Sequence, residues 1–142
     1  MVGMDILQPA VVLAAWTMVM WTWMYVTRIP AMVALKVDPD SLARDPEAKL
    51  DKLLPPQVQW KAHNYNHLHE APTVFYAVAI MLAITRQGDG TSALLGWAYV
   101  GLRVVHSLVQ ATLNRVTLRF AIFVGSSLVL IVLIAHAAVA VF

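Results

Sequence analysis

Four apolar segments, each about 20 residues long, limit what this chain can fold into. They span residues 6–26, 65–85, 94–113 and 120–142. About 20 apolar residues cross the hydrocarbon core of a bilayer as a helix, whereas a membrane β-barrel needs alternating strands of about ten residues. These segments do not alternate, and a backbone inside a bilayer must satisfy its own hydrogen bonds. The sequence therefore predicts an all-α membrane protein built as a bundle of four transmembrane helices.

The composition agrees with this fold class, since 60% of the 142 residues are hydrophobic and only 13% are charged. A soluble domain of this size would expose more charge. The connections are too short for a separate soluble domain, so we expect residues 1–142 to form one membrane domain with a cytoplasmic loop over residues 31–57. Its four helices are expected at about residues 6–29, 58–86, 92–113 and 117–141. The chain has no cysteine, so the protein itself supplies no thiol nucleophile.

The basic residues are concentrated in two of the connections between the helices. Six lie in or beside the first connection and two lie in the third: Arg28, Lys36, Arg44, Lys49, Lys52 and Lys61, then Arg115 and Arg119. The positive-inside rule therefore places these two connections in the cytoplasm and both termini outside. The net charge of +2 gives no reason to expect nucleic acid as a partner.

Polar residues within the apolar segments fall in one layer, the cytoplasmic half of the predicted bundle. At about 100° per residue, four side chains share one face of the second helix and three share a face of the third. They are His63, Asn66, His67 and Glu70, then Arg103, His106 and Gln110. Asn64 and His69 point elsewhere, whereas Arg28 ends the first helix and Arg119 begins the fourth at the same depth. Because a charge inside a bilayer costs at least roughly 2.5–3.5 kcal/mol, these residues should pair with each other or with a polar ligand.

A purely structural reading of this layer is open. Glu70 and Arg103 would then form a buried ion pair that sets the register of the two helices. Taken singly, Arg28 and Arg119 also fit arginines that extend toward the headgroups from helix ends.

A metal site is a second alternative. His63, His67 and Glu70 share one helical face, and zinc or non-haem iron accepts such ligands, with His106 as a further candidate. The spacing is not an H-E-x-x-H pattern, and the guanidinium of Arg103 would repel a dication.

Two segments resemble the signatures of a known family. Residues 64–76 read NYNHLHEAPTVFY and resemble the Asn…Glu…Pro…Phe signature of the MAPEG family, the membrane-associated proteins in eicosanoid and glutathione metabolism. Residues 102–110 read LRVVHSLVQ and, with Asn114 and Arg119-Phe120 after them, resemble the second signature of this family. The resemblance covers nearly the whole chain and is closest to the bacterial branch, with features of the microsomal glutathione transferases.

The resemblance implies a homotrimer that spans a bacterial inner membrane several times. Glutathione would lie at the subunit interface and face the cytoplasm. It would be held by the first two helices of one subunit and the last two helices of its neighbour. A lipophilic co-substrate would enter from the membrane lipids.

The resemblance also assigns roles to individual residues. Arg119 matches the arginine that stabilises the glutathione thiolate, which makes it the candidate catalytic residue. Glu70 resembles the carboxylate that binds the glutathione amine, and Asn66 resembles the neighbouring amide, although it precedes Glu70 by four residues where three are usual. The predicted glutathione-binding residues are Arg28, His63, Asn66, Glu70, Arg103, His106 and Gln110. Lys61 and His63 stand where relatives carry arginines, and Gln110 stands where several carry a tyrosine.

Two classes of function follow from these residues. The first is a glutathione-dependent transferase or peroxidase that acts on lipophilic electrophiles. A thiol has a pKa of about 8.5, and a nearby guanidinium lowers that pKa and so favours the nucleophilic thiolate. The second is a non-catalytic binding or scaffold protein that keeps the fold and its buried polar residues. The sequence alone does not decide between them.

Overall fold

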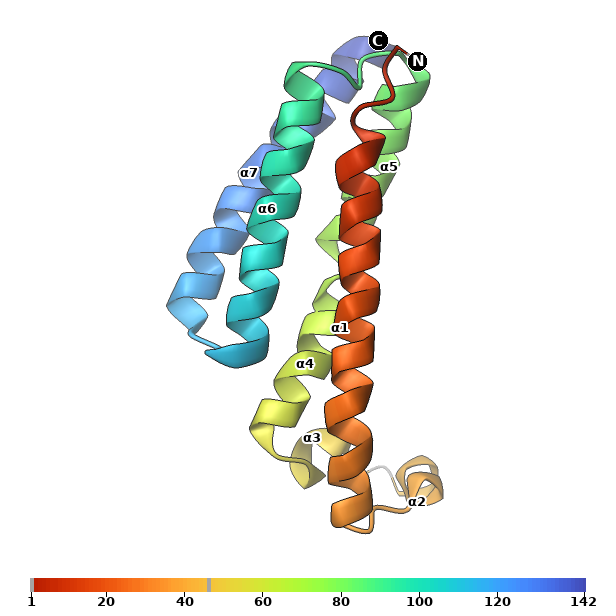
Figure 1. Ribbon diagram of the computed structural model, residues 1–142, viewed down its shortest axis with the longest axis vertical. Coiled ribbons are helices and arrows are strands. Elements are labelled where there is room, and N and C mark those ends of the chain that lie inside the picture. The colour runs from red at the N-terminus through yellow and green to blue at the C-terminus, as the bar shows by residue number, and fades with distance from the viewer. Residues whose placement is uncertain (1, 46) are drawn as a thin grey trace.

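The computed structural model describes residues 2–45 and 47–142 and consists of helices and connecting loops (Figure 1). The helices are α1 (Leu7–Ala34), α2 (Pro39–Arg44), α3 (Leu50–Leu53), α4 (Pro56–His67), α5 (Ala71–Ile84), α6 (Thr91–Thr112) and α7 (Val116–Val141). Four stretches are long and apolar enough to cross a membrane: Leu7–Ala34, Pro56–Ile84, Thr91–Thr112 and Val116–Val141. The prediction of an all-α membrane protein with four transmembrane helices is therefore confirmed.

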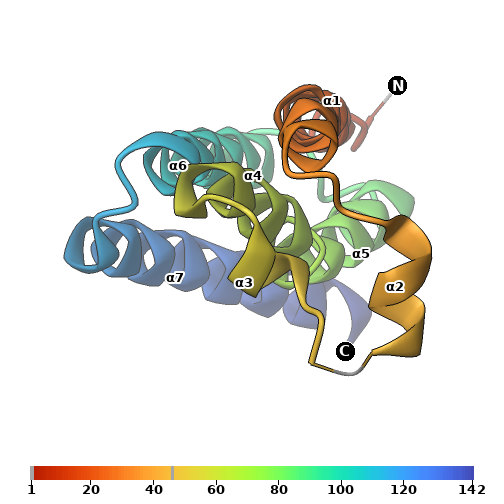
Figure 2. The same cartoon turned by 90° about the horizontal axis from the view of Figure 1, so that it is seen from below.

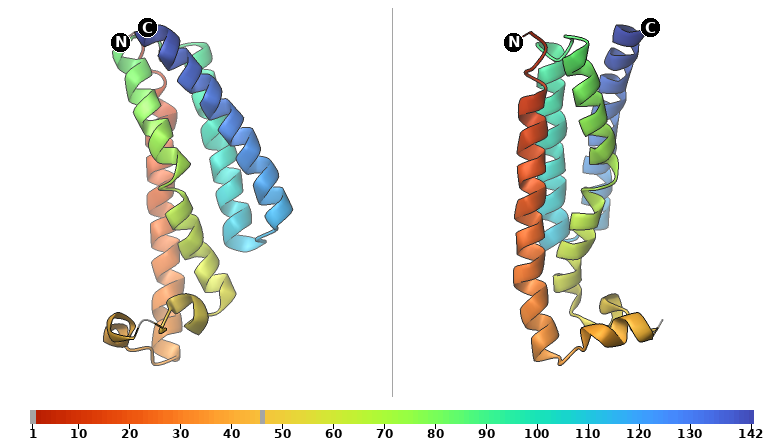
Figure 3. Two further views of the ribbon diagram at one scale, coloured as in Figure 1. Left: turned by 180° about the vertical axis from the view of Figure 1, so that it is seen from behind. Right: turned by 90° about the vertical axis from the view of Figure 1, so that its right-hand side faces the viewer.

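The four membrane-spanning segments (α1, α4 with α5, α6 and α7) form one elongated bundle. α6 packs against α1, α4 and α7, while α5 packs against α1 and α7. Both termini lie at one end of the bundle, and the short helices α2 and α3 lie at the other end (Figures 1 and 3). Seen from that end, α4 lies between α1 and α7 (Figure 2). The polar side chains of α4 can therefore face two different sides.

The first helix is longer than the sequence predicts. It continues to Ala34 although Pro30 lies inside it. A proline removes one backbone donor, and close to a helix end this loss is small enough for one more turn to form. The loop predicted over residues 31–57 also contains two short helices. In α2 the carboxylate of Asp38 caps the helix by accepting a hydrogen bond from the Asp40 N–H at 3.0 Å.

The second membrane-spanning segment consists of two helices, α4 and α5, whereas the sequence predicts one continuous helix over about residues 58–86. α4 ends at His67 and α5 begins at Ala71, with Pro72 in the first turn of α5. Proline has no N–H, so it cannot donate to the carbonyl one turn earlier, and it is well tolerated at the start of a helix. The Glu70 carbonyl instead accepts from the Thr73 N–H at 3.1 Å and from the Thr73 hydroxyl at 2.6 Å. The break therefore lies within the segment that crosses the membrane.

The apolar core lies mainly where α1, α5 and α6 meet. Phe75 of α5 and Tyr99 of α6 are fully buried, and their rings stack with centroids 4.5 Å apart. Leu13 and Met20 of α1 and Leu82 of α5 are also fully buried. This packing fixes α5 against α6 and so sets the direction in which the chain leaves the break.

A polar contact closes the end of the bundle that holds the termini. The Asp89 carboxylate accepts hydrogen bonds from the Gly3 N–H at 2.6 Å and the Asp5 N–H at 3.2 Å. The Ile6 N–H donates to the Gly88 carbonyl at 2.9 Å. These bonds to backbone N–H groups of Gly3 and Asp5 hold the pKa of Asp89 below its usual value. The N-terminal segment is thereby fixed to the turn between α5 and α6.

Candidate functional site

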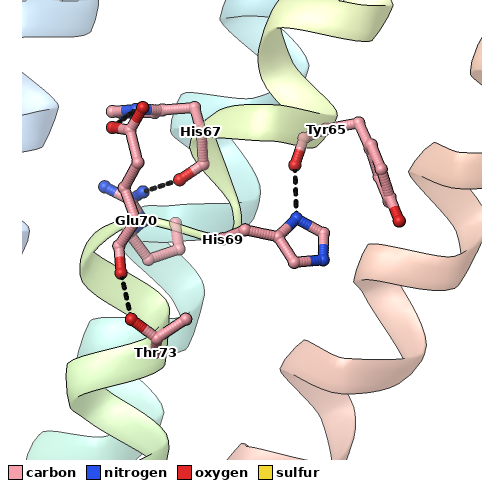
Figure 4. Close-up of polar contacts among 6 residues, drawn as sticks. Tyr65, His67, His69, Glu70 and Thr73 are labelled. Atoms are coloured by element: carbon pink, nitrogen blue, oxygen red, sulfur yellow. Dashed lines mark hydrogen bonds and ion pairs between the residues drawn. The ribbon is translucent and has the colours of Figure 1, made fainter.

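The break between α4 and α5 places a histidine and a carboxylate in direct contact (Figure 4). Nδ1 of His67, at the end of α4, lies 2.6 Å from Oε2 of Glu70. The His67 side chain is 19% exposed, whereas that of Glu70 is 65% exposed. The pair therefore joins a mostly buried imidazole to an exposed carboxylate.

The neighbouring histidine points to the other side of the chain. Nδ1 of His69 is bonded to the Tyr65 carbonyl at 2.8 Å, and its ring lies edge-on to the Tyr65 ring with centroids 4.6 Å apart. Figure 4 shows His67 and His69 on opposite sides of the break. This agrees with the prediction that His69 points away from the polar face.

Arg103 of α6 supports the break from within the bundle. Its side chain is fully buried, and Nη2 donates to the His67 carbonyl at 3.3 Å. Its Nε and Nη1 have no hydrogen-bond partner among the described residues. The guanidinium also lies 6.0 Å from the centre of the Phe123 ring. Arg103 thus ties α6 to the His67 carbonyl at the break, which also accepts a hydrogen bond from the Glu70 N–H at 3.3 Å.

The predicted Glu70–Arg103 ion pair does not form within the chain. The ion pairs within 4.0 Å among the described residues join Lys52 to Glu47, His63 to Asp51 and His67 to Glu70. Glu70 therefore pairs with an imidazole three residues before it, and the structural reading based on a Glu70–Arg103 pair is wrong.

A cavity of about 200 Å³ opens beside His67. It is lined by His67, His106, Val116, Arg119, Phe120 and Phe123, which come from α4, α6 and α7. The rings of His67 and His106 lie 4.9 Å apart at an angle of 38°, and the Phe123 ring lies 5.8 Å from His67. We call this cavity the Arg119 pocket. It combines cationic and imidazole groups with apolar walls.

Arg119 is oriented by the turn that precedes α7. Its Nη1 donates to the side-chain oxygen of Asn114, which lies in the left-handed backbone region with φ of 47°. Asparagine tolerates that conformation better than most residues. Because Arg119 lies in the first turn of α7, the positive end of the helix dipole adds to its charge. An anion in the Arg119 pocket would therefore be stabilised.

A second cavity, of about 360 Å³, lies on the other side of α4. Its walls include Arg28, His63 and Asn66, together with Lys49 and Asp51 of the loop before α4. We call it the Arg28 pocket. Nη2 of Arg28 donates to the Gln59 side-chain oxygen at 3.0 Å, and Nε2 of His63 lies 2.9 Å from the Asp51 carboxylate. Three of the predicted binding residues therefore line a different cavity from Arg119 within the chain.

Gln110 lines neither of these two cavities. It is buried in α6, and its side-chain oxygen has no hydrogen-bond partner among the described residues. One turn earlier, Ser107 accepts a hydrogen bond from the fully buried Asn64 of α4. This contact joins α4 to α6, as expected for the Asn64 side chain, which the sequence places away from the polar face.

The structure gives His67 a more central position than the sequence suggests. His67 precedes Glu70 by three residues, the spacing that the family signature usually has, whereas Asn66 precedes it by four. The three-residue spacing is the signal that could have identified His67. Phe120 belongs to the second signature, but Phe123, which also forms the apolar walls, could not be singled out in a helix that is apolar on nearly all sides.

The histidines do not converge on a common point. His63 bonds to Asp51 beside the Arg28 pocket, whereas His67 and His106 lie beside the Arg119 pocket. In the part of the chain that the structure describes, there is no group of three or more His, Asp or Glu residues placed to hold a metal ion. The observed geometry does not support the metal alternative.

Comparison with known proteins gives one match, to a protein family. The family model described as "MAPEG family" matches residues 6–139, which is nearly the whole chain. No curated protein and no solved structure matches.

Proposed function

Because the chain belongs to the MAPEG family, we propose that it is a membrane enzyme that uses glutathione against lipophilic electrophiles, as a transferase or a peroxidase. The observation that carries this proposal is the Arg119 pocket. It directs a guanidinium and two imidazoles into a cavity with phenylalanine walls, in a chain with four membrane-spanning helices. Such a site can stabilise a thiolate while it admits an apolar partner.

The chemistry assigned to Arg119 follows from its permanent charge. A guanidinium within about 4–6 Å of a thiol favours the thiolate, which is the nucleophilic form. The hydrogen bond from Arg119 to Asn114 fixes the position of the guanidinium before the ligand binds. Phe120 and Phe123 offer an apolar surface to the electrophile, which would enter sideways from the bilayer.

The two separate pockets favour a site built by two subunits of a homotrimer. The Arg28 pocket is formed by α1, α4 and the loop between them, whereas the Arg119 pocket is formed mainly by α7, with His67 of α4 and His106 of α6. In the proposed trimer, the Arg28 pocket of one subunit faces the Arg119 pocket of its neighbour, with glutathione between them. Arg28, His63 and Asn66 would then bind the carboxylates and amides of glutathione. Glu70 would bind its amine.

We place this site on the cytoplasmic side of a bacterial inner membrane. Both pockets lie toward the end of the bundle opposite the termini, where the basic residues are most numerous. The positive-inside rule assigns that end to the cytoplasm. Arg103, His106 and Gln110 would support the site from α6, and of these three His106 lines the Arg119 pocket.

The proposal is tested by calorimetry and turnover on the purified protein in detergent. We expect glutathione to bind and to be consumed together with a lipophilic aryl halide. The Arg119→Ala variant should lower kcat/KM on the order of 10- to 1000-fold, because the thiolate loses its nearest permanent cation. Arg115→Ala is the matched control, since Arg115 is exposed one helical turn earlier, and it should change little.

Two results would decide against this function. Equal activity in the Arg119→Ala and Arg115→Ala variants would remove the role given to Arg119. A wild-type protein that shows neither heat of binding with millimolar glutathione nor turnover would favour the non-catalytic scaffold.

A further inference from the structure

The His67–Glu70 pair has the geometry of an oriented base. A carboxylate accepts hydrogen bonds, so the 2.6 Å contact requires the hydrogen of a neutral imidazole to be on Nδ1. The other ring nitrogen, Nε2, then carries a free electron pair. Among residues 2–45 and 47–142, the His67 ring makes no other hydrogen bond to protein. Glu70 therefore selects the tautomer in which Nε2 can accept a proton.

The position of the ring places this base beside the anion-stabilising group. His67 and Arg119 both line the Arg119 pocket, and the rings of His106 and Phe123 hold His67 on two sides. The His67 backbone is fixed as well, since Arg103 donates to its carbonyl. Packing and hydrogen bonds of this kind keep a catalytic group in one orientation.

Charges that disfavour an imidazolium and one that favours it lie around the ring. Arg103 of α6 and Arg119 of α7 repel an imidazolium, and so would His106 of α6 if it were protonated. Glu70, on the same segment of chain, attracts an imidazolium. A group that must both accept and release a proton needs such a balance.

From this arrangement we infer that His67 is the general base that takes the proton from the glutathione thiol, with Glu70 as its positioning residue. This inference rests on the proposed function. The S–H bond breaks, the proton moves to Nε2 of His67, and the electron pair stays on sulfur beside Arg119. Sulfur then forms a bond to the electrophilic carbon. The leaving group departs with its bonding pair, and the imidazolium releases its proton to water when the leaving group is a halide, or to the leaving group when it is basic, which restores neutral His67.

The test compares the two histidines on either side of the break. In His67→Gln the side chain keeps polar atoms but cannot exchange a proton, whereas His69→Gln changes a ring that faces Tyr65. We expect His67→Gln to lower kcat on the order of 100-fold and to flatten the rising limb of the pH–rate profile. Glutathione binding, measured by calorimetry, should change much less. His69→Gln should keep the profile of the wild type.

A second variant separates a base from a structural group. His67→Ala leaves space beside Arg119, and added imidazole should restore part of its activity in proportion to the concentration of the neutral base. A purely structural role for His67 predicts no rescue. Glu70→Gln, in a protein that keeps His67, should lower kcat. The neutral amide no longer favours the tautomer with its hydrogen on Nδ1 as strongly as the carboxylate does.

The outcomes for the two proposals are distinct. If the wild type neither binds nor turns over glutathione, the proposed function fails. If the wild type is active but His67→Gln matches His69→Gln in kcat and in pH profile, only the role of His67 is overturned. Absence of imidazole rescue in a folded His67→Ala variant would also overturn it.

Discussion

At individual positions, the site depends on neighbouring side chains that face different ways. Asn66 and His67 are consecutive, yet Asn66 lines the Arg28 pocket and His67 lines the Arg119 pocket. Successive residues on a helix point about 100° apart, so a helix with cavities on two sides can serve both. α4 is therefore the element that the two pockets share.

Asn64 and Ser107 make the polar contact that fixes α4 against α6. Ser107→Ala would leave the Asn64 amide buried without this partner, so we expect the free energy of unfolding to fall by about 1 kcal/mol. Ser127→Ala is the control, because the Ser127 hydroxyl donates to the Phe123 carbonyl within its own helix. Reversible unfolding in detergent measures both variants. Equal stability of the two would show that the contact contributes nothing.

At the scale of the helices, the hydrogen bonds from the N-terminal segment to the Asp89 carboxylate make the stability of the fold depend on pH. The pKa of this carboxyl is lowered in the folded protein, chiefly by the Gly3 N–H and then by the Asp5 N–H. Its contribution is therefore present above the ordinary pKa of 3.8 and is lost as the pH falls through the lower folded value. We expect Asp89→Asn to lower the Tm at neutral pH, with a difference from wild type that shrinks below about pH 4.

The control for this prediction is Asp40→Asn in α2, where the carboxylate makes no hydrogen bond in the described structure. Thermal melts over a pH range of about 3 to 7, which includes the ordinary pKa of 3.8, compare the two variants. A constant difference between Asp89→Asn and wild type over this range would contradict the assignment.

The four transmembrane segments could be predicted because each follows from one physical requirement, an apolar stretch of about 20 residues. The family resemblance, which rests on residues 64–76 and 102–120, is likewise confirmed by the match over residues 6–139. The break between α4 and α5 could not be predicted by extending a helical wheel through Pro72. The missing N–H of Pro72 favours the break, whereas the contact from Arg103 to the His67 carbonyl comes from another helix and leaves no local signal in the sequence.

The sequence predicts which residues of the candidate site lie at the same level of the bundle, but not which of them contact one another. Arg119 and His106 do line one cavity, as their shared layer suggests. The pairing of Glu70 with His67 and the separation of Arg28 from Arg119 arise from the packing of whole helices, which residue spacing does not contain. Their roles toward glutathione stay predictions.

For the assembled protein, a site shared by two subunits makes a prediction that a site within one subunit does not. In the proposed homotrimer, Arg28→Ala and Arg119→Ala chains should each be nearly inactive, with at most about a tenth of the wild-type activity. Co-expressed chains should form mixed trimers in which about one interface in four, by random pairing, unites an intact Arg28 pocket with an intact Arg119 pocket. We therefore expect activity to return to roughly a quarter of the wild-type level, measured as turnover per trimer.

The control for this experiment is a mixture of the two variants purified separately and combined without subunit exchange, which should stay inactive. Recovery in that control, or none in the co-expressed trimers, would contradict a site shared between subunits.

Titration of glutathione into the purified protein, followed by thiolate absorbance at neutral pH, tests whether this fold activates a thiol. The wild type and the Arg115→Ala variant should show a saturable thiolate signal. The Arg119→Ala variant should lose the signal while its unfolding temperature and oligomeric state stay the same. The absence of a thiolate signal in the wild type, or an undiminished signal in folded Arg119→Ala, would contradict the account.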